Sequence, residues 1–203
     1  WLVAESQSLL GDCLARKGAF ADAEPLLVNA FPTISTWSPP ARQRRVSTLE
    51  RIVNIREHDW TLHSDFAWIL ADTTDLGQRS LERATSLARQ AVENDPENPA
   101  ALRALGSVFF RAGEWDRASE VMAKAIELQK DQRLPHEHLF LAMAQWQQGK
   151  QEEAGQSYKT ALAQMKGRRS PDLGRYRQEA AKLLGITQPK AKPKPVAKPD
   201  KSP

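Results

Sequence analysis

A pattern of small residues at fixed offsets recurs along this chain of 203 residues. In the central copy, offsets of 3, 7, 9, 12 and 19 from Gly106 lead to Phe109, Gly113, Trp115, Ala118 and Ala125. From Gly11 they lead to Leu14, Gly18, Phe20, Ala23 and Ala30, and from Ala142 to Gln145, Gly149, Gln151, Ala154 and Ala161. Small residues let two helices approach closely, and the aromatic residues are expected to fill the space beside them. The pattern therefore predicts repeated helix–turn–helix units.

The spacing of the copies identifies the type of repeat. Ala84 and Ala118 are 34 residues apart, and Ala118 and Ala154 are 36 apart. Together with Leu102, Leu105, Gly106, Phe109, Ala118, Met122 and the preceding Pro96, this spacing resembles the tetratricopeptide repeat (TPR) family over roughly three quarters of the chain. The resemblance implies an all-α solenoid of about ten helices, with a C-terminal capping helix and a disordered tail.

A narrower resemblance concerns the repeat tails of bacterial serine/threonine protein kinases. It is carried by LLGDCLARKGAFADAEPLL, FAWILADTTD, ARQAVENDPENPAALRALGSVFFRAGEWDRASEVMAKAIEL and HLFLAMAQWQQGKQEEA. The sequence contains no Gly-rich phosphate loop, no HRD and no DFG, which a kinase domain needs. We therefore expect this chain to be noncatalytic, and to be a fragment because it begins with Trp1. In the alternative, a kinase domain precedes Trp1 and uses the repeats to recruit substrates or to regulate itself.

Prolines, glycines and helix-capping residues divide the chain into three regions. Residues 1–60 are expected to form a first helical hairpin (2–16 and 20–31), a loop over FPTISTWSPP and a linker helix over 41–56. Residues 61–185 are expected to contain repeat helices over 61–72, 80–94, 99–128 with its Gly turn, 135–148 and 151–165, and a capping helix over 171–184. Asn98 and Ser170 are the predicted N-caps beside Pro99 and Pro171. Residues 73–79 form an elongated connection, and 186–203 a disordered Lys/Pro-rich tail.

The excess of positive charge in this chain comes from the C-terminal tail. The formal net charge is +4, and residues 186–203 contain five lysines and one aspartate, so residues 1–185 have no net charge. No nucleic-acid partner is expected, because the excess does not form a stripe on the folded part. Whether the tail binds acidic surfaces stays open. The third helix has an apolar stripe, and its opposite face, with Arg42, Arg44, Arg45 and Arg51, is interpreted as a solvated surface.

Composition and local geometry exclude several other classes. The longest apolar stretches are far shorter than the roughly 18–20 residues that span a bilayer. Cys13, the single cysteine, favours a reducing compartment, and we expect a cytoplasmic protein with Cys13 as a small buried residue. His136 and His138 are two positions apart on a helix and point about 200° apart, so they do not share a metal. No cofactor or metal is predicted.

The function expected from the resemblance is protein–protein interaction. In this family the first helix of each pair lines the concave side, where partner peptides bind. The resemblance places the candidate peptide-binding residues there: Arg103, Ser107, Phe110, Arg111, His136, Leu139, Met143 and Trp146. A neighbouring repeat or the chain's own terminal helix could instead cover these aromatic residues. The Lys/Asn carboxylate clamp of chaperone-binding members is not recognisable, and self-association remains open. The sequence predicts a scaffold that binds a peptide or domain.

Overall fold

A computed structural model describes residues 2–30, 39–56, 58–72, 77–129, 134–167 and 170–186. These residues form ten α-helices and no strand. The helices are α1 (Leu2–Arg16), α2 (Phe20–Ala30), α3 (Pro39–Ile55), α4 (Trp60–Asp72), α5 (Gly77–Asn94), α6 (Pro99–Arg111), α7 (Trp115–Leu128), α8 (Pro135–Gln147), α9 (Gln151–Met165) and α10 (Pro171–Leu183). The predicted all-α repeat fold is confirmed.

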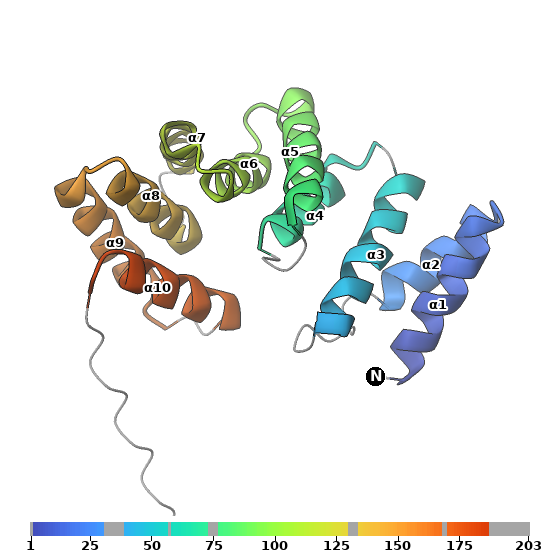
Figure 1. Ribbon diagram of the computed structural model, residues 1–203. Helices are drawn as coiled ribbons and strands as arrows, with labels where there is room; N and C mark the ends of the chain where they lie inside the picture. Colours follow the sequence, from blue (N-terminus) through green and yellow to red (C-terminus); the bar gives the residue numbers. More distant parts are fainter. Residues whose placement is uncertain are drawn as a thin grey trace, which may run out of the picture.

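The helices follow one another along an arc (Figure 1). Four antiparallel hairpins, α1–α2, α4–α5, α6–α7 and α8–α9, make the most extensive contacts. The single helix α3 lies between the first two hairpins and contacts α1, α2 and α4. The first helices α4, α6 and α8 contact one another in series along the inner side of the arc, and α10 packs against α8. We call this side the inner face.

The central hairpin shows why these residues form helices. The Asn98 side-chain oxygen accepts hydrogen bonds from the backbone N–H groups of Ala100 (3.0 Å) and Ala101 (3.2 Å). Pro99 occupies the first turn of α6, where its missing N–H costs no helical hydrogen bond. Gly113 ends the helix with a φ of +79°, a conformation that glycine adopts without a steric penalty. The predicted cap and turn are confirmed here. Ser170 is also at an N-cap position, but its side chain makes no capping hydrogen bond.

The small residues of the repeat pattern lie where the paired helices touch. A Cβ atom added to Gly106 would lie 2.8 Å from Met122 Cε, and one added to Gly11 would lie 2.7 Å from Leu27 Cγ. Fully buried alanines occupy both later small positions in all three copies: Ala23, Ala30, Ala118, Ala125, Ala154 and Ala161. The small residues of the repeat pattern therefore mark the places where the paired helices approach each other closely, as predicted.

Three side chains are more exposed than expected. Phe20 and Trp115, at the aromatic position that opens each second helix, are 53% and 37% exposed, so they do not fill the space beside the small residues. Cys13 is exposed, not buried. It follows Gly11 by two positions, which turns its side chain by about 200° from the face that packs on α2. The prediction of a buried Cys13 was wrong for this reason.

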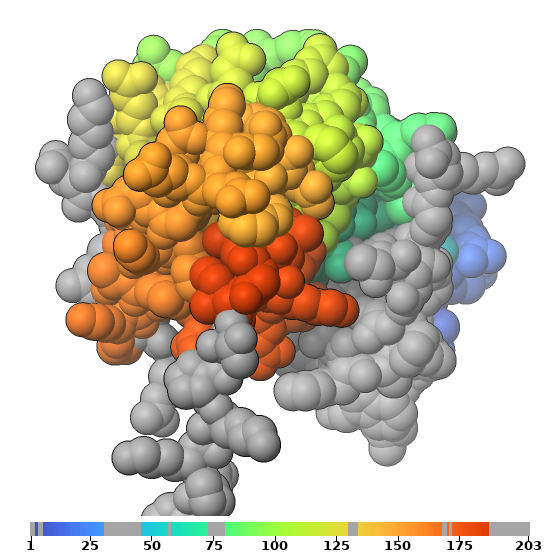
Figure 2. Space-filling view, turned by 60° about the vertical axis from the view of Figure 1, so that its left-hand side comes forward, coloured from blue at the N-terminus to red at the C-terminus, as the bar shows by residue number. Residues whose placement is uncertain are grey.

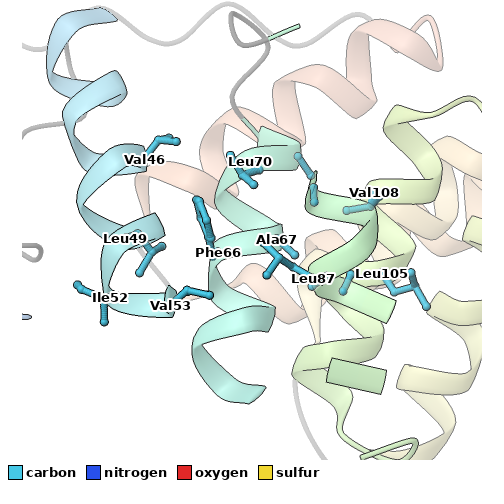
Figure 3. Close-up of a cluster of buried hydrophobic side chains, with 14 of the residues drawn as sticks. Val46, Leu49, Ile52, Val53, Phe66, Ala67, Leu70, Leu87, Leu105 and Val108 are labelled. Atoms are coloured by element: carbon cyan, nitrogen blue, oxygen red, sulfur yellow. The ribbon is translucent and has the colours of Figure 1, made fainter. Parts of the chain in front are cut away.

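Two neighbouring hydrophobic clusters form the core. The larger one extends from α2 to α8, and Figure 3 shows Val46 and Val53 of α3 projecting toward α4. The second cluster joins α7 to α10 through buried residues such as Leu139, Phe140 and Tyr176. Trp68 and Phe110 pack against both clusters. The apolar stripe predicted for the third helix is confirmed.

Several boundaries differ from the prediction. Helix α3 begins at Pro39, because prolines are tolerated in a first helical turn, and α5 begins at Gly77, three residues before the predicted Ser80. Arg51 is not simply solvated, since it forms an ion pair with Asp12 of α1 and donates to the Ser47 carbonyl at 2.9 Å. The remainder of the predicted loop (31–38), residues 73–76 of the elongated connection and the predicted tail beyond residue 186 lie outside the described residues, as do the other basic side chains of α3. In the described part of the chain, each helix is too short or too polar to cross a membrane.

Candidate functional site on the inner face

Arg103 lies at the centre of the inner face, on α6. Its guanidinium group is 5.3 Å from the centre of the Trp68 ring on α4, and its Nη1 is 3.4 Å from Oε1 of Glu137 on α8. The Glu137 side chain is 2% exposed, whereas that of Arg103 is 32% exposed. A buried carboxylate needs a positive partner. Arg103 therefore connects three first helices and still has part of its surface open to solvent.

Asp65 of α4 adds an acidic group to this region. Burial raises the pKa of Asp65, and the positive charge of Arg103 opposes that rise. Asp59 contributes a further, smaller increase in this pKa. The centre of the inner face thus combines an aromatic ring with charges of both signs.

A second arginine connects the inner face to α10. Arg111, at the end of α6, binds both carboxylate oxygens of Glu179, with Nη2–Oε2 at 2.9 Å. Its guanidinium lies 5.5 Å from the ring centre of Phe110 and 5.7 Å from that of Phe140. Burial lowers the pKa of Arg111, but the bond to Glu179 and nearby negative charges raise it overall. Paired hydrogen bonds of this kind fix orientation as well as charge.

About one turn earlier in α10, two side chains bind Asp72, the last residue of α4. The Tyr176 hydroxyl donates to Asp72 Oδ1 at 2.7 Å, and Arg175 Nη2 lies 2.5 Å from Asp72 Oδ2. The Arg175 guanidinium also lies 4.9 Å from the Tyr176 ring centre. Burial, and then the negative charge of Asp72, raise the pKa of the Tyr176 hydroxyl well above its ordinary value. The neutral hydroxyl is therefore the form that this site stabilises.

An aromatic cluster fills the space between these polar contacts. Ring centres 5.1 to 5.8 Å apart connect its members in tilted or edge-to-face pairs: Trp68, Phe110, His136, Phe140 and Tyr176. Such pairs contribute about 0.5–1.5 kcal/mol each beyond simple burial. The cluster joins α4, α6 and α8 to α10 in one packed unit.

The structure divides the predicted site residues into two groups. Arg103, Phe110, Arg111 and His136 come together around the aromatic cluster. All four are partly buried and have contacts within the chain. They are placed so that a ligand on this face would meet their remaining exposed surface.

The other predicted residues lie deeper. Leu139 and Met143 are fully buried, and Ser107 is 2% exposed with its hydroxyl donating to the Ala104 carbonyl at 2.7 Å. Trp146 is half-buried against the cluster that joins α7 to α10. Leu139, Met143 and Ser107 thus form the wall beneath the inner face.

Sequence reasoning missed the acidic partners and the role of α10. Asp72, Glu137, Tyr176 and Glu179 were not among the candidates, although Tyr176 was placed on the apolar side of the last helix. A glutamate in the first turn of the otherwise apolar HEHLFLAMAQW was the available signal for a buried ion pair. His136 packs its ring against Trp68 and Tyr176, and no group of three or more potential metal-binding residues occurs in the described ranges.

Comparisons with known proteins agree with this architecture. The family model described as "Tetratricopeptide repeat" matches residues 73–133. Among solved structures, a thermophilic TPR protein of Thermus thermophilus is 20% identical, with a TM-score of 0.50 over 89% of this chain and 98% of that one. The structure "MamA 41-end" from Desulfovibrio magneticus RS-1 is 15% identical, with a TM-score of 0.51 over 82% and 97%. A search of curated protein sequences gave no significant match.

Proposed function

We propose that this tetratricopeptide repeat protein is a noncatalytic scaffold that holds a partner peptide against the inner face of α4, α6 and α8. Protein partners are the general expectation for this repeat. The observation that carries the proposal is the Arg103 side chain, which is 32% exposed and rests on the Trp68 ring. A rigid cation beside an aromatic surface is well suited to bind an acidic group of a peptide.

The surroundings of Arg103 support this role. Its contact with Glu137, at 3.4 Å, is longer than an ordinary charge-assisted hydrogen bond, so Arg103 retains donor capacity for a ligand carboxylate or phosphate. The Trp68 ring and the Glu137 carboxylate already restrict its rotamers. A ligand would therefore order little of the protein on binding, and the entropy cost would fall mainly on the peptide.

The accessible residues define the contact surface of this proposal. Arg103, Phe110, Arg111, His136 and Trp146 are all partly exposed, so they are the proposed peptide contacts. Ser107, Leu139 and Met143, by contrast, would act through the shape of the wall, because their side chains are buried. Substitutions at these three positions would change stability as well as binding.

A peptide selection tests the proposal. Short random peptides are selected by display on the intact chain, and the dissociation constant of the best binder is measured by fluorescence anisotropy. Arg103→Ala should weaken binding about tenfold or more, the loss expected when a charged hydrogen bond is removed. Trp146→Ala should also weaken it, through lost apolar contact.

Arg117→Ala is the matched control. Arg117, on the second helix α7, also rests on an aromatic ring, 4.9 Å from the Phe109 centre, and pairs with Glu114 at 2.5 Å. Its loss should leave peptide binding unchanged. If the Arg103 and Trp146 variants bind the peptide as tightly as the Arg117 variant and the wild type, and circular dichroism shows intact folds, the binding site does not lie on the inner face.

The alternative, in which the repeats are the regulatory or substrate-recruiting tail of a bacterial serine/threonine kinase, rests on the sequence resemblance. Neither of the two similar proteins reported above is named as a kinase. Reading the sequence upstream of Trp1 for a Gly-rich loop, HRD and DFG tests it directly. Their absence from the full-length sequence would end this alternative and leave the scaffold proposal intact.

A further inference from the structure

The last helix does not lie where a cap of the solenoid would lie. Helix α10 packs against the first helix α8, with polar contacts to α4 and α6, and has no comparable contact with α9. No residue of α9 is among the large exposed hydrophobic side chains of the described chain. The end of the stack at α9 therefore does not require a cover, and the place of α10 needs another explanation.

Helix α10 is bound as a ligand helix would be bound in a groove. Leu173, Tyr176 and Ala180 of α10 and Leu184 at its C-cap are 3%, 1%, 0% and 6% exposed, and they follow helical spacing. Polar contacts fix its position along the groove, Tyr176 to Asp72 of α4 and Glu179 to Arg111 of α6. The opposite side of α10 faces solvent, as its red surface in Figure 2 shows.

We propose that α10 is a built-in occupant of a helix-binding groove formed by α4, α6 and α8, and that a partner helix displaces it. The groove recognises an amphipathic helix with an apolar residue, a tyrosine three positions later and a glutamate three positions after that. This is the pattern of Leu173, Tyr176 and Glu179. The proposal rests on the proposed function, because it describes how binding to the same inner face is regulated.

The contacts that hold α10 permit displacement. Each of the two ion pairs has one solvent-accessible partner, because Arg175 is 50% exposed and Glu179 is 34% exposed, and ion pairs that solvent can reach contribute little net stability. The connection from α9 consists of residues 166–170, so α10 stays close to the groove after it leaves. An external helix thus competes with an effective concentration on the order of millimolar. Its apparent affinity is reduced by the fraction of molecules in which the groove is open.

A labelled peptide with the sequence of residues 170–186 tests the proposal. The probe is added to the intact wild-type chain and to a chain with Tyr176→Ala, which weakens the internal helix but leaves the groove unchanged. Anisotropy should show binding to Tyr176→Ala at least about tenfold tighter than to the wild type, because the open fraction rises. If Tyr176→Ala does not fold, Glu179→Gln serves, since it removes only the contact with Arg111.

Groove specificity is tested in the Tyr176→Ala chain. Asp72→Asn removes the negative charge that pairs with the probe's arginine and one of the two acceptor oxygens, and should weaken probe binding about tenfold or more. Glu114→Gln, which changes an acidic residue paired on the second-helix side, should have no effect. A folded Tyr176→Ala chain that does not bind the probe, or binds it equally well with Asp72→Asn, overturns the proposal.

A pair of glycine substitutions tests regulation without removing any contact. An added Cβ meets nothing within 4 Å at Gly174 of α10 or at Gly155 of α9. Gly174→Ala should stabilise α10 and weaken binding of the selected peptide about two- to fivefold, whereas Gly155→Ala should leave binding unchanged. Arg103-dependent binding that is insensitive to Gly174→Ala and to the probe would refute the occupant role and retain the proposed function. If peptide binding depends neither on Arg103 nor on Gly174→Ala and the probe, both the occupant role of α10 and the proposed function are refuted.

Discussion

The two ends of the solenoid differ in how much apolar side-chain surface they expose to solvent. Helix α1 leaves Val3, Leu9 and Leu10 at 71%, 60% and 53% exposure. Helix α9 buries Ala154, Tyr158 and Ala161 and has none of the large exposed hydrophobic residues of the described chain. Because the outer side of α9 is already polar, α10 turns onto the inner face instead of covering it.

The difference teaches that an amphipathic pattern does not identify the neighbour of a helix. Both α1 and α10 make polar contacts with other helices: Asp12 of α1 pairs with Arg51 of α3, whereas α10 is bound by two first helices that are far away in the sequence. Asp72 and Arg111 lie at the ends of α4 and α6, where they meet Tyr176 and Glu179. The matched polar ends give α10 a defined place, whereas the apolar side of α1 has a shallow hollow of about 320 Å³ lined by Val3, Ser6, Gln7 and Leu10.

The largest effect should follow removal of the side chain that anchors α10. Tyr176 is 1% exposed, and Tyr176→Ala deletes both a buried ring and the hydrogen bond to Asp72. The free energy of unfolding should fall by about 3–5 kcal/mol, as measured by urea denaturation. Hydrogen exchange should show the loss of protection first in α10. A uniform loss across all helices would contradict the independent docking of α10.

The small residues at the hairpin contacts should give the next largest effect. Gly11→Ala and Gly106→Ala each place a Cβ within 3 Å of a neighbouring side chain, so each should destabilise the fold by about 1–3 kcal/mol. Gly11→Ala should lower the free energy of unfolding more than Gly106→Ala. The added Cβ at Gly11 meets Leu27 Cγ, which is near the Leu27 backbone, whereas the one at Gly106 meets the Cε at the flexible end of Met122. Gly155→Ala, with open space, should instead stabilise by about 0.5–1 kcal/mol. Thermal unfolding of the three variants measures the differences.

The sequence was sufficient for features that depend on local spacing. The turn glycines, the alanine contacts and the Asn98 cap follow from helical geometry within one hairpin, so they could be read from residue offsets. The burial of Glu137 and the docking of α10 depend on residues 34 and 68 positions away, namely Arg103 and Arg111. Periodicity within a helix does not contain such information. The family resemblance does not contain it either, and it placed Leu139 and Met143 among the groove residues although both are fully buried.

A smaller effect is expected at high pH. The pKa of the Tyr176 hydroxyl is raised in the folded state by burial and by Asp72, so deprotonation favours the unfolded state. Stability is retained below the unfolded pKa of about 10 and falls as the pH rises above it, by at most about 1.4 kcal/mol per pH unit. Tyr176→Phe should remove this part of the pH dependence. Equal slopes for the wild type and Tyr176→Phe between pH 9 and pH 11 (roughly the window around that pKa) would show that the hydroxyl is not protected.

The smallest effect should occur at the other end of the solenoid. Leu10 of α1 is 53% exposed, so Leu10→Gln removes little buried apolar surface and should change the free energy of unfolding by no more than about 0.5 kcal/mol. Leu27→Ala, in the fully buried side of the same hairpin, should cost about 2–5 kcal/mol. Urea denaturation at several protein concentrations measures both. A large, concentration-dependent loss for Leu10→Gln would mean that another molecule covers α1 in solution, and the contrast between the two ends would then disappear.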